Sequence, residues 1–327
     1  MTTRISQSRL KDWRACHKKH DYKWNQHLQR KMPSKPLMTG TMLHDMIDAY
    51  AVKGRKKAMA VFKKHEAALK KFVQEDPETY EGLAEKVLGI FNNYIEYYEE
   101  DGLTFQESEF EIVVALGEDL ELVVHIDKVV TDKEGRLWIM DHKGHRSIPG
   151  ADDRMSDIQL VFYPWAWNRK FPKRQATGII WDYLRTKVPV VPEMLKNGEL
   201  SQRKNMDTTF EVYKKAIEDN KLDITNYAGM LDMLKGQQNS FFERVFLPVA
   251  NDHQLTVVIE DLMTTSREIR DHGKDLKDRN LNTWTCRGCM FKDLCLAELK
   301  GLDSDFIRKS RFNIQEKYDA SEAEIND

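Results

Sequence analysis

The chain has 327 residues, of which 41% are hydrophobic and 32% charged, and its formal net charge is -2. This composition excludes a disordered or low-complexity chain. No apolar run reaches the roughly 18 residues of a membrane span, and the polar start has no apolar stretch of a secretory signal, so we expect a cytoplasmic protein.

Charge is distributed unevenly along the sequence. Residues 1–71 contain 18 Lys and Arg against 5 Asp and Glu, whereas the remainder contains 33 against 48. A basic segment of this size can neutralise backbone phosphates, and release of their counterions is the main sequence-independent source of affinity for nucleic acid. A solvated helical face has the same composition. The charge alone therefore leaves both interpretations open.

Residues 1–100 are predicted to be helical, because their apolar residues recur at helical spacing. Capping residues and prolines mark the boundaries. The expected elements are a first helix capped by Ser6 or Ser8, a loop at residues 32–36, a second helix from about Gly40 and a third helix over residues 81–98.

Residues 105–185 have the pattern of an α/β core. Three runs rich in β-branched and aromatic residues are separated by short turns that contain glycine, which favours an antiparallel meander. The three strands begin at about Glu109, Leu120 and Arg136, a helix covers residues 153–168, and a fourth strand begins at Ala176. The expected fold class is therefore α/β, in the order helix, three strands, helix, strand.

The remaining segments surround this core. Residues 186–240 are polar and helical in pattern, and we interpret them as an insertion. Residues 241–300 are expected to hold a long helix, at about 252–271, and a cysteine cluster. Residues 301–327 form a charged tail for which a helix and partial disorder both fit. We expect one elaborated domain over residues 1–327.

Acidic residues and a lysine occupy the ends of two predicted strands. Alternation places Asp141 and Lys143 on one face of their strand, with His142 pointing the other way. Asp127 lies in the preceding strand, and a connecting loop with an odd number of residues would make it a neighbour of Asp141. Two adjacent carboxylates repel each other unless a cation binds between them, and Mg²⁺ or Mn²⁺ suits such oxygen ligands. An ordinary surface ion pair would also explain so short a pattern.

Several motifs accompany these residues in a fixed order. They are GTMLH with His44, HIDKVV with Asp127, MDHKG with Asp141 and Lys143, and QLVFY with Gln159 and Tyr163. On these motifs, the chain resembles the RecB-like branch of the PD-(D/E)XK nuclease superfamily over about residues 1–185 and 250–300. The resemblance implies a restriction-endonuclease-like core that hydrolyses phosphodiester bonds with Mg²⁺ or Mn²⁺.

The resemblance also implies the metal ligands. They would be His44, Asp127, Asp141 and the backbone carbonyl of His142. Glu109 matches a less constant acidic position, for which Glu111 is a competitor. Without this context, His44 would be interpreted as a histidine of the core.

The same resemblance assigns roles to three further residues. Lys143 would position the attacking water or the phosphate and stabilise the developing charge. Gln159 and Tyr163 would orient Lys143 and the DNA strand, and they share one helix face because they are four residues apart. Tyr163 would otherwise be explained by packing.

Four cysteines form a separate pattern, with Cys16 near the start and Cys286, Cys289 and Cys295 near the end. In a reducing compartment they are better interpreted as ligands or packing residues than as disulfides. Four thiolates suit zinc or a [4Fe-4S] cluster. The arrangement resembles the iron-sulfur subgroup of RecB-like nucleases, which includes AddB-type exonucleases and the CRISPR adaptation exonuclease, and this implies [4Fe-4S]. Either group would fasten the two ends of the chain together.

Basic residues near Cys16, interleaved with aromatic residues, and a basic patch in the insertion are candidate contacts for DNA. They are Arg14, Lys18, Lys19, Lys23, Arg203 and Lys204. The stretch WDYLRTKVPVVPEML and the absence of a helicase motif resemble stand-alone phage-encoded members. The host cytoplasm would then be the location, and replication or recombination proteins the partners.

The function implied is that of a metal-dependent DNA exonuclease. We expect it to prefer single-stranded ends, with 5′ to 3′ polarity favoured, in phage or bacterial DNA replication, recombination or repair. One alternative is a catalytically weak iron-sulfur protein that binds DNA or acts as a scaffold. Another is a structure-specific or RNA-directed nuclease of the same fold.

Overall fold

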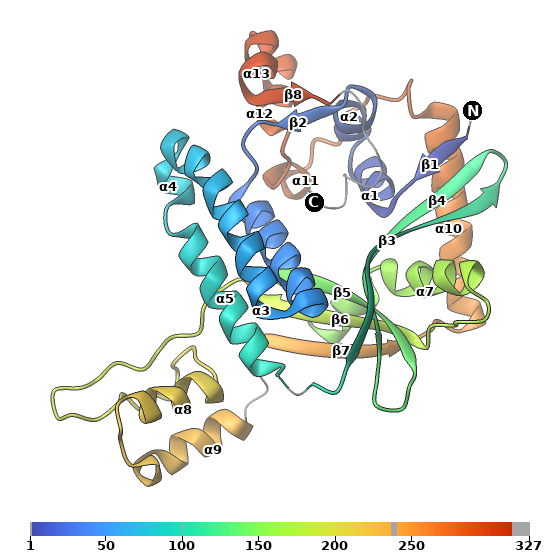
Figure 1. Cartoon of the computed structure of the whole chain (residues 1–327). Coiled ribbons are helices and arrows are strands. Elements are labelled where there is room, and N and C mark those ends of the chain that lie inside the picture. Colours follow the sequence, from blue (N-terminus) through green and yellow to red (C-terminus); the bar gives the residue numbers. More distant parts are fainter. Residues whose placement is uncertain (1, 100, 237–240, 316–327) are drawn as a thin grey trace.

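A mixed β-sheet lies at the centre of the computed structural model, which describes residues 2–99, 101–236 and 241–315 (Figure 1). Within these ranges six strands form it: β1 (Thr3–Ile5), β3 (Thr104–Gly117), β4 (Leu120–Thr131), β5 (Leu137–His145), β6 (Gly178–Arg185) and β7 (Phe242–Pro248). The order is β1, β4, β5, β6, β7, with β3 paired to β4. The fold is mixed α/β, as predicted.

The predicted meander is present, because β3, β4 and β5 pair in antiparallel order. Residues 132–136 connect β4 to β5, which is a loop with an odd number of residues. The ladder between β4 and β5 ends at the pair Lys128 and Met140. The next positions in this register are Asp127 and Asp141, so the two carboxylates face each other where the ladder ends.

Helices cover both faces of the sheet (Figure 1). In chain order they are α1 (Gln7–Ala15), α2 (His17–His20), the π-helical η1 (Asp21–Asn25), α3 (Lys35–Glu75), α4 (Pro77–Tyr80), α5 (Leu83–Tyr97), α6 (Ala151–Met155), α7 (Gln159–Lys170), α8 (Phe210–Asp219), the 3₁₀ helix η2 (Ile224–Tyr227), α9 (Ala228–Gly236), α10 (Asp252–His272), α11 (Thr283–Arg287), α12 (Lys292–Leu299) and α13 (Ser304–Arg311). No described helix is long and apolar enough to span a bilayer.

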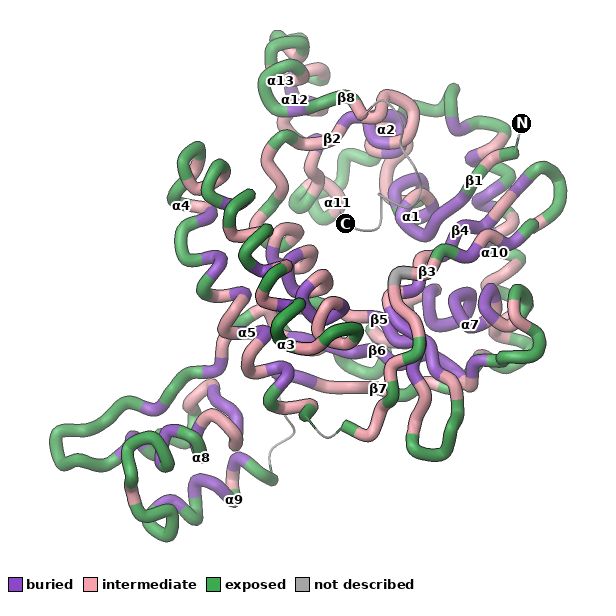
Figure 2. Tube along the Cα trace, in the orientation of Figure 1, coloured by how far each residue is buried: buried purple, intermediate pink, exposed green. Residues whose placement is uncertain are grey.

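Alternation along β6 explains how the two helical layers attach. Ile179 and Trp181 lie in the hydrophobic cluster that contains α7 and α10, whereas Leu184 joins the cluster of α3 and α5. A strand buried on both faces needs apolar residues at nearly every position, which accounts for the run GIIWDYL. Figure 2 shows this continuous burial along β6.

The N-terminal part differs from the prediction in two respects. It contains the short strand β1, which pairs in parallel with β4, besides β2 (Leu28–Arg30). The second helix begins at Lys35 rather than near Gly40, inside the expected loop. The Ser34 hydroxyl accepts a hydrogen bond from the backbone of Leu37, and Pro36 occupies the first turn, where its missing N–H costs nothing.

Helix α3 folds back on itself. Lys53 and Gly54 leave the helical conformation, and Gly54 has a φ of +67°, which glycine adopts without strain. His65 Nε2 then lies 2.6 Å from Asp45 Oδ2. This contact joins the two arms of an antiparallel helical hairpin, which are residues 35–52 and 55–75. The third predicted helix, α5, is confirmed.

The helix predicted over residues 153–168 is interrupted. It is divided into α6 and α7 by the segment around Asp157, whose carboxylate accepts a hydrogen bond from the backbone of Gln159 at 3.0 Å. Short acidic side chains compete with helical hydrogen bonding in this way. Helix α7 therefore begins at Gln159, and this places the Gln159 side chain in its first turn.

The insertion is less helical than predicted. Residues 186–209 contain no described helix, and their isolated bridge joins Met194 to Leu200. Helices α8 and α9 pack around a small cluster with Tyr213 and Tyr227, apart from the sheet (Figure 1). The chain then returns to the sheet as β7, a strand that the sequence did not predict. Residues 237–240 lie outside the described ranges.

The C-terminal part contains the predicted long helix, α10, which begins with a capping box formed by Asn251 and Gln254. The described tail forms α13 and then β8 (Phe312–Ile314). Strand β8 pairs in antiparallel order with β2. The two ends of the chain are thus joined by a small sheet, while residues 316–327 of the predicted tail lie outside the description.

Candidate active site

Asp127 is held by two neighbouring elements. His44, in the first arm of α3, places Nε2 3.0 Å from Asp127 Oδ1, and the backbone N–H of His142 donates to Oδ2 at 2.9 Å. Burial by itself would raise the pKa of Asp127, but the His44 charge and these hydrogen bonds hold it well below its usual range. Asp127 and Asp48 likewise raise the pKa of His44 to about 10, against the effect of burial.

Asp141 and Lys143 lie on the same face of β5 as predicted. Lys143 Nζ is 2.7 Å from Asp141 Oδ2 and donates a hydrogen bond to Gln159 Oε1 in the first turn of α7. Gln159 Nε2 donates in turn to the Tyr163 hydroxyl at 2.5 Å. The structure therefore brings Lys143, Gln159 and Tyr163 together in one chain of contacts.

The two carboxylates have different electrostatic environments. Burial raises the pKa of Asp141 to about 7, and the nearby Asp127 acts in the same direction while Lys143 opposes it. Burial also lowers the pKa of Lys143, but Asp141 and Asp157 outweigh this effect and raise it. Lys143 accordingly stays a cation, and Asp127 carries the more stable negative charge.

His142 points away from these residues and into a second buried network. Its Nδ1 lies 2.6 Å from Asp182 Oδ2, and Arg244 Nε lies 3.0 Å from Asp182 Oδ1. The Tyr94 hydroxyl also donates to Asp182. Asp182 is fully buried, which would raise its pKa, yet Arg244 and His142 hold the pKa well below its usual range. This network fixes the orientation of the His142 ring.

The sequence analysis missed Asp182 and Arg244. The signal for Asp182 was its position as the charged residue within the apolar run GIIWDYL. Asp182 lies beside His142 in the parallel register of β5 and β6. The partner Arg244 belongs to β7, so only the sheet order brings it to Asp182.

The sequence analysis also missed Asp48 and Lys128, which form an ion pair behind His44. Asp48, one helical turn later, places Oδ2 3.3 Å from His44 Nδ1 and Oδ1 3.2 Å from the buried Lys128 Nζ. A carboxylate behind an imidazole orients the ring and strengthens it as a ligand. The i to i+4 spacing of His44 and Asp48 was visible in the sequence, whereas Lys128 required the contact between α3 and β4.

Of the two competing glutamates, Glu111 has its printed contact outside this group. Glu111 faces His125 across the ladder of β3 and β4, with 4.0 Å between Oε2 and Nε2. Glu109 lies in β3, but its side chain is outside what the structure describes. Among the described residues, no group of three or more His, Cys, Asp and Glu side chains is arranged to hold a metal ion. Asp127 and Asp141 contact His44 and Lys143 instead.

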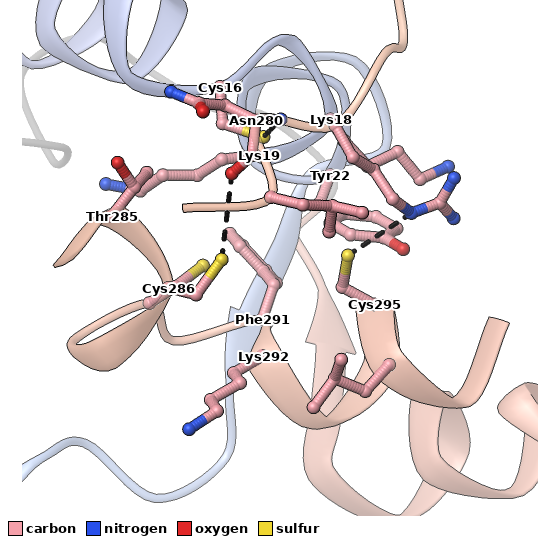
Figure 3. Close-up of a pocket in the computed structure, with 14 residues that line it drawn as sticks. Cys16, Lys18, Lys19, Tyr22, Asn280, Thr285, Cys286, Phe291, Lys292 and Cys295 are labelled. Carbon is pink, nitrogen blue, oxygen red and sulfur yellow. Dashed lines mark hydrogen bonds between the residues drawn. The ribbon is translucent and has the colours of Figure 1, made fainter. Parts of the chain in front are cut away.

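The four cysteines line one pocket between the two ends of the chain (Figure 3). Their thiols are free of disulfides in the described structure. The backbone N–H of Asn280 donates to Cys16 Sγ at 3.4 Å, and Arg279 Nε donates to Cys295 Sγ at 3.3 Å. Hydrogen bonds of this kind are common around metal-bound thiolates. The four thiols therefore share one pocket, although the described cysteines are not arranged as a metal site.

The basic residues proposed from the sequence to contact DNA have several structural partners. Arg14 donates to Thr265, and Lys18 pairs with Glu298 at 3.3 Å. Lys19 and Lys23 lie 2.5 and 3.3 Å from the two carboxylate oxygens of the buried Asp12. Their role toward DNA stays a prediction, as does that of the exposed pair Arg203 and Lys204.

Comparison with known families identifies the class of protein. A model of the PD-(D/E)XK nuclease superfamily matches residues 4–296, so the chain belongs to that superfamily. The class implies a hydrolytic nuclease that acts on DNA, and its members typically use Mg²⁺ or Mn²⁺.

No curated protein matches the sequence. Among solved structures, the crystal structure of SSO0001 is similar with 11% identity and a TM-score of 0.28, covering 80% of this chain and 85% of that one. A candidate exonuclease from Eubacterium rectale is similar with 13% identity and a TM-score of 0.31, covering 73% and 84%. Similarities at this level add nothing to the functional assignment.

Proposed function

We propose that this chain is a metal-dependent DNA exonuclease whose phosphodiester hydrolysis takes place at Asp127, Asp141 and Lys143. One observation carries the proposal: Lys143 bridges Asp141 and Gln159 beside the pair of Asp127 and His44, in a chain of the PD-(D/E)XK superfamily. A lysine and two converging carboxylates at the end of a strand ladder are the groups that this hydrolysis requires.

The residues fit a divalent cation by their chemistry. Carboxylate oxygens, an imidazole and the carbonyl of His142 suit Mg²⁺ or Mn²⁺, which would supply an activated water and neutralise phosphate charge. His44 and Lys143 now contact the two carboxylates, so a cation would compete with them. Asp48 orients the His44 ring, and the N–H of His142 orients Asp127.

Lys143 serves the reaction through its charge and its fixed position. Its raised pKa keeps it protonated, and Gln159 and Tyr163 restrict its rotation. A positioned cation stabilises negative charge that develops on a phosphate far better in a buried site than in water. We assign Gln159 and Tyr163 to positioning.

The proposed substrate is a single-stranded DNA end, degraded from 5′ to 3′ during phage or bacterial DNA replication, recombination or repair. The sequence resemblance supports this choice. A catalytically weak DNA-binding or scaffold protein is less favoured because Asp127, Asp141 and Lys143 are all present and in contact distance of catalytic partners. A structure-specific nuclease of the same fold is the second alternative.

We further propose that Cys16, Cys286, Cys289 and Cys295 bind a [4Fe-4S] cluster, with zinc as the alternative. The shared pocket supports a common ligand. Iron and acid-labile sulfide assays with visible absorption distinguish the two groups: a brown protein is expected, and a colourless protein with stoichiometric zinc would overturn the cluster.

Lys143→Ala tests the nuclease mechanism. We expect a 10²- to 10³-fold loss of turnover on labelled single-stranded DNA with Mn²⁺, the usual effect of removing one charge-stabilising donor (about 3 to 4 kcal/mol). The matched control is Lys173→Ala, which removes an exposed lysine on the loop after α7 and should retain wild-type turnover. Equal rates for Lys143→Ala and wild type would refute the mechanism.

Substrate preference needs a separate assay. End-labelled single-stranded DNA, duplex DNA and RNA of one sequence should be digested in parallel. Faster digestion of single-stranded DNA, with mononucleotide release from the 5′ end, is expected. A preference for branched duplexes would favour the structure-specific alternative.

A further inference from the structure

The second arm of α3 carries a row of lysines, which we call the lysine stripe: Lys56, Lys57, Lys63, Lys64, Lys70 and Lys71. The residues form two adjacent rows in which successive lysines are seven residues apart. Seven residues are close to two helical turns, so each row follows one side of the helix. At about 1.5 Å per residue, the stripe extends for about 20 Å.

The stripe is exposed along its whole length. All six lysines are solvent-exposed, whereas Ala58, Phe62 and Leu69 on the opposite side are buried against α5 and the first arm. Figure 2 shows exposed residues recurring along α3 between the kink and α4. No ion pair joins the stripe to any residue that the structure describes, and its ammonium groups are open to an external partner.

The charge of this arm is unbalanced. Residues 55–75 contain seven Lys and Arg but only two acidic residues, Glu66 and Glu75. An exposed helix normally mixes both signs, because like charges on one face repel each other and acidic neighbours provide stabilising i to i+4 pairs. A row of positive charges that forms no ion pairs with the described residues suits a ligand with regularly spaced negative charges.

The stripe belongs to the same helical hairpin as the candidate active site. Its central residue Lys64 directly precedes His65, which contacts Asp45 in the first arm. Asp45 in turn directly follows His44, the residue that contacts Asp127. A strand that lies along the second arm therefore runs beside the helix that contributes to the site.

We propose that the lysine stripe binds the phosphate backbone of single-stranded DNA that extends from the active site. This inference rests on the proposed function for the identity of the strand. Lysine suits the role because its flexible stem follows phosphates without a fixed register. Binding of this kind depends on counterion release and is independent of sequence.

The test replaces the lysines of one row of the stripe in the 327-residue chain. The variant carries Lys56→Gln, Lys63→Gln and Lys70→Gln, and a matched control replaces three other exposed lysines, Lys173, Lys274 and Lys300, with Gln. Both proteins lose three positive charges. Binding of a labelled single-stranded oligonucleotide is measured by fluorescence anisotropy with EDTA present, over a series of salt concentrations.

We expect the stripe variant to bind at least ten-fold more weakly at low salt. Its plot of log affinity against log salt should be shallower by about 2, since each lost phosphate contact on a single strand removes about 0.7. The control should stay within two-fold of wild type. A second variant, Lys57→Gln, Lys64→Gln and Lys71→Gln, should show the same change. Agreement between the two variants would exclude a local folding defect in one of them as the cause.

Two results would overturn the inference. One is an unchanged salt slope in both stripe variants. The other is unchanged DNA binding together with lost binding to vesicles of phosphatidylserine and phosphatidylcholine, which would assign the stripe to a membrane surface. Because binding is measured without divalent metal, the outcome is independent of cleavage: loss of turnover in Lys143→Ala tests the site, and the salt slope tests the stripe.

Discussion

Two basic regions of the N-terminal segment have similar composition but different structural roles. In the region of α1, α2 and η1, the ammonium groups of Lys19 and Lys23 lie against the buried Asp12, and Lys23 is only 2% exposed. In the second arm of α3, the lysine stripe is exposed and has no acidic partner among the described residues. Positive charge stabilises the fold in the first region and is available for a ligand in the second.

The distribution of acidic residues accounts for the difference. Asp12 and Asp21 are both buried and lie 3 to 11 residues from the lysines of this region that they pair with. The second arm of α3 has only two acidic residues, Glu66 and Glu75. A count of lysines therefore says little about nucleic-acid binding until their partners are known.

Asp12→Ala should produce the largest effect on stability. It removes the Asp12 carboxylate from the buried Lys23 and from Trp24 Nε1, which donates to it. Breaking a buried pair in this way costs about 3 to 5 kcal/mol. Urea unfolding followed by circular dichroism measures the loss, and a decrease below about 1 kcal/mol would contradict the assigned role of the pair.

Acid should weaken the same region. Burial raises the pKa of Asp12, but Lys23 and Lys19 outweigh it and lower the pKa below the unfolded value of about 4. The contribution of Asp12 is therefore complete above that value and is lost as pH falls through the folded pKa. Asp12→Asn should show a smaller loss of stability between about pH 5 and pH 2 than wild type.

A matched pair of single substitutions compares the two regions directly. Lys23→Gln should cost about 1 to 3 kcal/mol, because it removes a positive charge from the buried Asp12 carboxylate, whose Oδ2 then keeps only the Trp24 donor. Lys63→Gln should change the free energy of unfolding by no more than about 0.5 kcal/mol, as expected for an exposed side chain. Equal losses would show that the two regions do not differ as the structure indicates.

The smallest effect is expected for the insertion. Replacing Arg203 and Lys204 with Gln removes two exposed cations, so the salt slope of DNA binding should fall by at most about 1.4. Stability should be unaffected, since neither side chain is buried. A fall as large as that of the stripe variant would make the insertion the principal DNA contact.

Much of the candidate site could be predicted because it depends on local periodicity. Alternation placed Asp141 and Lys143 on one face of β5, and the odd loop length brought Asp127 opposite Asp141. The i to i+4 spacing of Gln159 and Tyr163 likewise fixed their shared face, and the structure joins their side chains. Such relations follow from backbone geometry within one element or one hairpin.

The boundaries of helices and the contacts between segments far apart in the sequence were harder to predict. The sequence pattern predicts a helix start near Gly40, whereas the helix begins at Lys35, because a proline at the first turn resembles a loop residue. The interruption at Asp157 depends on one side chain that competes for a backbone N–H. The strand β7 and the pairing of β2 with β8 involve segments far apart in the sequence.

The sequence by itself determined the α/β core, the order of the motifs and the positions of the two carboxylates and the lysine, because the repeat of a strand or helix fixes which side chains share a face. Only the tertiary structure decided that Arg244 and Tyr94 meet Asp182 behind His142. It also decided which lysines are paired and which are exposed. Burial and charge pairing depend on the whole fold, and no local pattern encodes them.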